Sequence, residues 1–160
     1  MKFNHIIEVN DPLNPLIEPL TREQLWRGLV LRAEAPQLFM PHLDACTITL
    51  RSDNEVSREL AFGELIIRDR VTFHPPQKIA YLVPAQDDIA ESTLTMTIEE
   101  PQADLFYVRF EYDDGTMQAA ESVDAFYNEF RRSAYHEADI DTIRIIREFA
   151  EAGRFDTPPA

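Results

Sequence analysis

Arg58 is the residue whose setting most suggests chemistry, because it alternates with Val56, Leu60 and Phe62 along one predicted strand. A guanidinium that shares a face with apolar side chains is costly to bury unless a carboxylate pairs with it. Arg58 therefore has two interpretations. Either it projects into a cavity and orients a carboxylate, phenolate or carbonyl of a ligand, or it lies near a sheet edge and reaches solvent or a structural acid. We favour the second.

Two acids of the last predicted helix pose the same question. On a continuous helix, Glu137 and Asp141 fall on the apolar stripe of that segment. Either the helix bends or breaks near Asp139, where an aspartate would cap a second segment, or the acids face a cavity or a subunit contact. A carboxyl group in apolar surroundings has a raised pKa and can act as a general acid or base. Pairing of Arg58 with Asp141 would explain both residues, but for the acids we favour capping or solvation.

Other motifs that carry chemistry are missing from the sequence. The four histidines are dispersed, and only His5 shares a face with apolar neighbours, so a hydrogen-bonded core histidine is favoured there over a metal ligand or a base. The four glycines form no phosphate-binding loop, and no serine stands in a nucleophile elbow. Cys46 is the only cysteine, which excludes an intrachain disulfide. We predict no metal and no cofactor.

The net charge of −14 argues against two classes of partner. Nucleic acids bind basic surfaces and anionic membranes attract basic segments, so we expect neither a nucleic-acid partner nor membrane insertion. No stretch approaches the roughly 18 apolar residues of a membrane span, and the first residues lack the apolar core of a signal peptide. We therefore predict a cytoplasmic protein, and the sequence leaves a homodimer open.

The elements that would position these residues begin with a strand from Lys2 to Val9 and a proline-containing loop. A helix follows from Arg22 to about Ala33. Thr21, just before it, and Gln24, in its first turn, have the spacing of a capping box. Pro36 ends this helix and begins a short helical turn.

Six further strands are predicted by short β-rich segments between turns. They are about Ala45–Arg51, Val56–Glu64, Ile67–Phe73, Ile79–Val83, Ser92–Glu99 and Leu105–Tyr112. Their short connections favour antiparallel neighbours. One face of the sheet is apolar, with Ile48 and Leu50 on it, so the first helix and a long amphipathic helix between Ala119 and Phe155 must cover that face. We expect one domain over residues 1–155 and a disordered tail at 156–160.

In this order of elements the chain resembles the helix-grip fold of the START, Bet v 1 and polyketide-cyclase-like proteins, and more narrowly the AtaL-like group. The segments that carry the resemblance are Val9–Pro12, Leu20–Leu29, Arg58–Gly63, Ala134–Tyr135 and Ala138–Glu148. The resemblance implies an α+β fold: a seven-stranded curved antiparallel sheet packed against a long C-terminal helix, with a short helical segment between the first two strands. It also implies a hydrophobic cavity, which in the wider superfamily binds lipids, sterols, hormones or polyketide-like compounds. The AtaL-like group offers no catalytic motif to transfer.

Three functions are then open. The first, which we favour, is binding of a hydrophobic or aromatic small molecule between the sheet and the C-terminal helix. The second is a cyclase, aromatase or hydratase that acts on such a molecule without a metal or nucleotide cofactor, and the third is a protein-interaction domain with a filled core. The candidate cavity residues are His5, Trp26, Arg58, Leu60, Phe62, Val71, Phe73, Tyr81, Met96, Phe126, Phe130 and Asp141. A filled core and a ligand cavity use the same residue types, so the pattern alone does not separate these functions.

Overall fold

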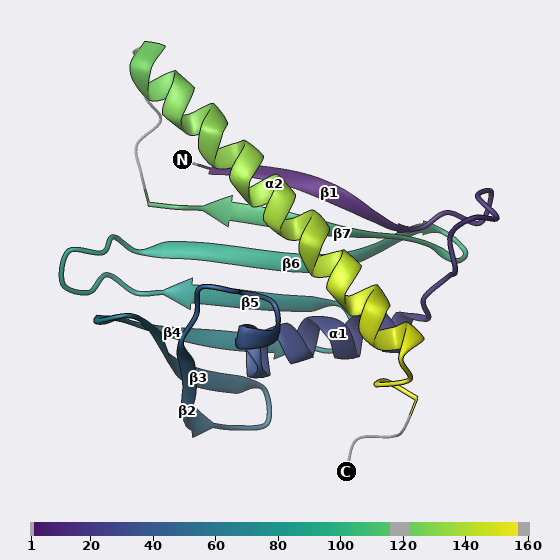
Figure 1. The fold of residues 1–160 in the computed structure, drawn as a ribbon, viewed down its shortest axis with the longest axis horizontal. Coiled ribbons are helices and arrows are strands. Elements are labelled where there is room, and N and C mark those ends of the chain that lie inside the picture. Colours follow the sequence, from purple (N-terminus) through teal and green to yellow (C-terminus); the bar gives the residue numbers. More distant parts are fainter. Residues whose placement is uncertain (1, 116–121, 157–160) are drawn as a thin grey trace.

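A computed structural model of the chain describes residues 2–115 and 122–156, with the backbone alone over 122–126. A seven-stranded antiparallel sheet forms one layer, and the helices lie together over one of its faces (Figure 1). This is the α+β helix-grip arrangement that the order of elements predicts. The predictions made for the side chain of Phe126 and for the tail at 157–160 fall outside the described part of the chain.

The sheet brings the first and last strands of the chain together. Its strands are β1 (Lys2–Asn10), β2 (Ala45–Arg51), β3 (Glu55–Phe62), β4 (Leu65–His74), β5 (Lys78–Val83), β6 (Ser92–Gln102) and β7 (Leu105–Asp113), in the spatial order β1-β7-β6-β5-β4-β3-β2. All neighbours are antiparallel, as the short connections predict. β1 and β2 therefore form the two edges of the sheet.

The first helix, α1 (Arg22–Glu34), begins at the predicted capping box. The hydroxyl of Thr21 accepts a hydrogen bond from the backbone N–H of Gln24 at 3.0 Å, and the side-chain oxygen of Gln24 accepts one from the N–H of Thr21 at 2.9 Å. A short 3₁₀ helix, η1 (Pro36–Leu38), follows with proline at its first position. Local chemistry alone thus determines where α1 begins.

The last helix, α2 (Ser122–Glu151), runs without a break through residues 139–141, so no aspartate caps a second segment there. Figure 1 shows it crossing the sheet diagonally, with its first turns beyond the edge strand β1. Tyr127 and Phe130 in these turns are 59% and 65% exposed, whereas Ile146 near the other end is fully buried. Only the C-terminal half of α2 therefore packs over the centre of the sheet.

Beneath α1 and this half of α2 the space is filled by apolar side chains. The core includes Leu25, Leu29, Val71, Ile79, Met96, Ile98, Val108, Phe110 and Ile146, each at most 1% exposed. On β6 and β7 every second side chain faces this core, among them Met96, Ile98, Val108 and Phe110, but the prediction that Leu50 faces it is wrong. A β-bulge between Ile48 and Leu50 shifts the register of β2, and Leu50 is 69% exposed.

α1 and α2 approach each other most closely at Gly28. A Cβ atom built on this residue would lie 2.4 Å from Cγ2 and 2.8 Å from Cγ1 of Ile146. Such distances are shorter than real contacts between carbon atoms. The two helices can therefore cross this closely only because residue 28 has no side chain.

Replacing Gly28 by Ala tests this contact. Alanine alone favours a helix by about 1 kcal/mol over glycine, but overpacking against Ile146 should dominate and lower the free energy of unfolding by about 1–3 kcal/mol. In the double variant Gly28→Ala/Ile146→Ala the clashing atoms of Ile146 are absent. Its loss in free energy of unfolding should therefore be well below the sum of the losses of the two single variants. Urea denaturation measures all three variants, and strictly additive costs would contradict the contact.

Candidate functional site

A cavity of about 430 Å³ lies where the packed core ends, between the sheet and the middle of α2. Its apolar walls come from the loop after η1 and from the three strands β4, β5 and β6: Phe39, Met40, Ile67, Val83 and Leu94. Its polar walls include Arg32, Tyr81, Tyr112, Asp139 and Thr142. A mostly apolar hollow of this size with a few polar side chains is typical of a small-molecule site.

Asp139 of α2 is the central acid of this wall and is 0% exposed. Its Oδ2 atom lies 2.6 Å from Nε2 of His5 on β1. The hydroxyl of Tyr112 on β7 lies 2.8 Å from both carboxyl oxygens and donates to them. One carboxyl group thus joins the first strand, the last strand and the last helix.

Burial controls the protonation of this group. It raises the pKa of the Asp139 carboxyl above its ordinary value, although the hydrogen bonds from Tyr112 and His5 and the nearby charge of Arg32 oppose the shift. Burial, together with the charge of Asp139, also raises the pKa of Tyr112, which therefore stays a hydrogen-bond donor. A carboxyl of this kind can exchange a proton with a ligand in the cavity.

Tyr81 and Arg32 form a second polar group in the cavity wall. Tyr81 is 7% exposed, and its hydroxyl has no hydrogen-bond partner among the residues that the structure describes. The guanidinium carbon of Arg32 lies 5.3 Å from the centre of the Tyr81 ring, and Nε of Arg32 donates a long hydrogen bond, 3.4 Å, to the hydroxyl of Thr142. A buried hydroxyl without a partner is costly, and a bound ligand could remove that cost.

Arg58 lies behind this wall rather than in it. It is 4% exposed and forms a bidentate pair with Asp69 of β4, with N···O distances of 2.8 and 2.5 Å, and it donates to the carbonyl of Ala33 at 2.7 Å. This pairing with a structural acid is the interpretation that we favour from the sequence. It replaces the suggested pairing with Asp141, which is exposed and lies 3.5 Å from Arg144.

The other residues predicted for the cavity are scattered through the molecule. Tyr81 lines it, and His5 contacts it through Asp139. Leu60, Val71 and Met96 are buried, and Phe62 and Phe73 are half-buried, but none of these five lines the cavity. Trp26 lines a separate groove beside Phe155, and Phe130 and Asp141 are exposed, so the structure places these three outside the cavity.

Three residues of the wall lie on buried stripes that could have been read from the sequence. Arg32 follows Leu25 and Leu29 at helical spacing, and Tyr112 continues the alternation of the inward side chains of β7. Asp139 precedes Ile143 by one turn. It was missed because the apolar stripe was traced from the first half of this helix, whose described residues 127–136 are mostly exposed.

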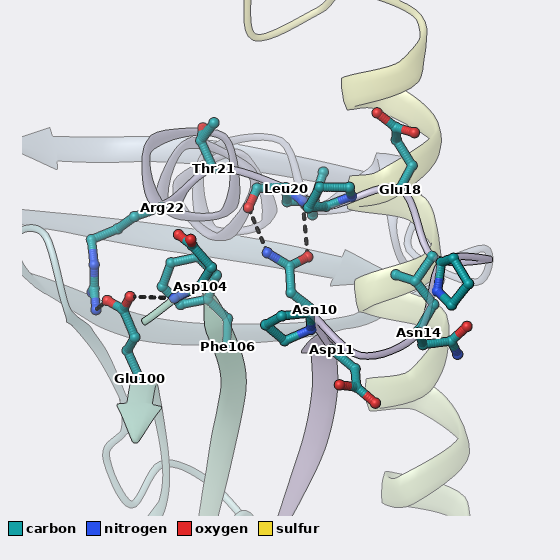
Figure 2. Close-up of a pocket in the computed structure, with 14 residues that line it drawn as sticks. Asn10, Asp11, Asn14, Glu18, Leu20, Thr21, Arg22, Glu100, Asp104 and Phe106 are labelled. Atoms are coloured by element: carbon teal, nitrogen blue, oxygen red, sulfur yellow. Dashed lines mark hydrogen bonds and ion pairs between the residues drawn. The ribbon is translucent and has the colours of Figure 1, made fainter. Parts of the chain in front are cut away.

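A larger hollow, about 790 Å³, lies at the other end of the sheet, among the loop 11–21, α1 and the turn between β6 and β7 (Figure 2). Its side chains bond to one another. The amide of Asn10 donates to the carbonyl of Leu20 and accepts from its N–H, and Glu100 accepts from Arg22 at 3.2 Å and from the N–H of Asp104 at 2.9 Å (Figure 2). Because these partners are already satisfied, we regard the cavity beside α2 as the better candidate site.

The described residues show neither a metal site nor a membrane-spanning helix. They contain no group of three or more His, Cys, Asp or Glu side chains placed to hold a metal ion. No helix among them has the length and apolar character needed to cross a membrane.

Comparison with known proteins identifies a family model that matches residues 7–153, described as AtaL: Acetylaranotin biosynthesis cluster protein L. No curated protein sequence matches the chain.

Solved structures share the fold at low sequence identity. The Zhui aromatase/cyclase from Streptomyces sp. R1128 is 13% identical with a TM-score of 0.64, over 94% of this chain and 93% of that one. The di-domain aromatase/cyclase StfQ from the steffimycin biosynthetic pathway is 14% identical with a TM-score of 0.66, over 96% of this chain and 52% of that one, so this chain spans about half of StfQ. Ara h 8.0201 is 8% identical with a TM-score of 0.59, over 92% and 98%. Such identities show the fold alone.

Replacing Arg58 by Met tests its structural role. The variant leaves the buried carboxylate of Asp69 without its guanidinium, which should lower the free energy of unfolding by about 3–5 kcal/mol. The double variant Arg58→Met/Asp69→Leu should recover most of that loss, because an apolar pair can replace a buried ion pair. Arg109→Met is the control, since the pair of Arg109 with Glu99 is about one-third exposed and should be worth at most about 1 kcal/mol. Equal losses for Arg58→Met and Arg109→Met in urea denaturation would contradict this role.

Replacing Asp139 by Asn tests the burial of its carboxyl. Because the pKa of Asp139 is raised in the folded protein, the native state keeps this proton to higher pH than the unfolded chain does. The contribution of this group to the stability of the wild type is therefore lost as the pH rises from about 4 through the raised pKa. The asparagine carries no such proton, so the free energy of unfolding of Asp139→Asn, minus that of the wild type, should increase over this range.

Urea denaturation at several pH values measures this difference. Asp141→Asn is the matched control, because it removes an exposed acid two residues away on the same helix. A pH dependence of the same size in both variants would show that burial of Asp139 is not its cause.

Proposed function

The chain belongs to the AtaL family, and from that premise we propose that it binds a hydrophobic or aromatic small molecule in the cavity between the sheet and α2. The cavity has the volume and the mixed lining of a ligand site. The aromatase/cyclase names of two proteins with the same fold supply the ligand class to examine first, which is polyketide-like aromatics.

The observation that carries this proposal is the hydroxyl of Tyr81. It is buried in the cavity wall without a hydrogen-bond partner among the described residues. A protein interior rarely keeps such a group unless something else satisfies it. A ligand with one polar atom near Tyr81 and an apolar body against Phe39 and Leu94 would do so.

A second function is favoured by Asp139. A cyclase, aromatase or hydratase needs a group that can give or take a proton beside the bound ligand, and Asp139 lines the cavity with a raised pKa. In this alternative the protein converts the molecule that it binds.

Thermal melting against fatty acids, sterols, flavonoids and polyketide-like aromatics tests the proposal. A ligand at 100 times its dissociation constant should stabilise the native state by ~2.7 kcal/mol and raise the melting temperature by roughly 5 to 10 °C. Ala138→Trp places a large side chain in the cavity wall and should abolish the shift. Ala134→Trp is the matched control, because Ala134 lies one turn earlier on α2, exposed and outside the cavity, and it should leave the shift unchanged.

The outcomes separate three functions. A shift that Ala138→Trp removes, with the ligand recovered unchanged by mass spectrometry, supports binding alone, whereas a changed mass or isomer supports the enzyme. No shift across the panel would overturn the proposal in favour of a protein-interaction domain, and a shift that Ala138→Trp preserves would overturn it in favour of binding elsewhere on the molecule.

A further inference from the structure

We propose that the ligand carries an anionic oxygen group, such as a carboxylate, which binds between Arg32 and Tyr81. This inference rests on the proposed function and adds the chemical class of the ligand. It places the charged end of the molecule at these two side chains and its apolar body against Phe39, Met40 and Leu94.

Arg32 supplies a cation whose charge no described residue neutralises directly. Among the residues that the structure describes, no carboxylate oxygen lies within 4.0 Å of its guanidinium, whereas Arg58 behind the wall has a bidentate partner. Nε of Arg32 donates to Thr142, and no hydrogen bond of normal geometry joins Nη1 or Nη2 to a described residue. Burial lowers the pKa of Arg32, but the neighbouring side chains, Tyr81 first among them, raise it overall, so Tyr81 lies close to the guanidinium. A guanidinium with both Nη groups free presents the fork that a carboxylate accepts.

Tyr81 supplies a neutral donor next to this cation. Its ring lies beneath two guanidinium groups, with the carbon of Arg32 at 5.3 Å and that of Arg58 at 5.2 Å from the ring centre. The ring is therefore held in place from the core side, and its unpartnered hydroxyl lines the cavity together with Arg32. A guanidinium with donors to spare and a hydroxyl beside it that has no acceptor are complementary to one ligand oxygen with negative charge.

Asp139 and Asp114, the two acids of the cavity wall, contact residues other than Arg32. Both oxygens of Asp139 accept from Tyr112, and Oδ2 also contacts His5. Asp114 lies 3.6 Å from Arg131. Neither acid lies within ion-pair distance of Arg32, so an anionic ligand is not displaced from it by a carboxylate of the protein.

A pair of fluorescent probes tests this inference. Anilinonaphthalene sulfonate carries an anionic oxygen group on nearly the same rings as the neutral probe phenylnaphthylamine. We expect Arg32→Gln to weaken the sulfonate by about 10- to 100-fold, the value of a charged hydrogen bond, and to change the neutral probe by less than about 3-fold. Tyr81→Phe should weaken the sulfonate by about 3- to 10-fold and spare the neutral probe. Naphthoate should displace the sulfonate, and naphthamide should not.

Arg70→Gln is the matched control, because it removes the same charge from an exposed position on β4 and should leave both probes unchanged. Retained binding of phenylnaphthylamine by Arg32→Gln shows that this variant folds. If both probes bind in the cavity and Arg32→Gln weakens them equally, the anionic class is wrong while the proposed function stands. If neither probe binds, or Ala138→Trp leaves both bound, the proposed function fails, and this inference fails with it.

Discussion

The buried carboxyl of Asp139 holds together elements from both ends of the chain. α2 crosses the sheet diagonally, and its middle contacts β1 and β7 through this carboxyl and through aromatic rings. The hydrogen bonds of Asp139 with His5 and Tyr112 are the polar part of this contact, and they lie beside the cavity. Aromatic stacking also holds α2 against β1 and β7. The centre of the Tyr112 ring lies 5.0 Å from that of Phe3 and 4.4 Å from that of Tyr135. The same acid thus positions the helix and lines the candidate site.

The division of the interior into a packed half and a hollow half follows from the two helices. α1 approaches the C-terminal half of α2 so closely that Gly28 touches Ile146, and the sheet beneath them is filled. α1 ends at Glu34, and the thinner loop after η1 replaces it above the ends of β5 and β6. The cavity lies where this second layer becomes thin.

The elements of this fold could be predicted because their signals are local. The capping box of α1 and the alternation along β6 and β7 each depend on residues a few positions apart. The side chains that pair across neighbouring strands could not be predicted, since the pairing depends on the register of the strands. Arg58 lies directly opposite Asp69 in the β3–β4 pair, yet a shift of one residue would have placed another side chain there. The wall of the cavity could not be predicted for the same reason. Arg32, Tyr112 and Asp139 each continue a buried stripe of their own element, but only their meeting in space distinguishes a cavity wall from a core.

The pairing of β1 with β7 has a consequence for how the chain is made. Ile7 lies opposite Val108, so about 100 residues of chain separate two strands that are neighbours in the sheet. The ribosome releases β1 first, and its only partner in the finished sheet emerges after all the other strands. The hairpins from β2 to β7 can form as they appear, since their loops are short and cost little entropy to close. The nascent chain must therefore keep β1 without its sheet partner until β7 has been made.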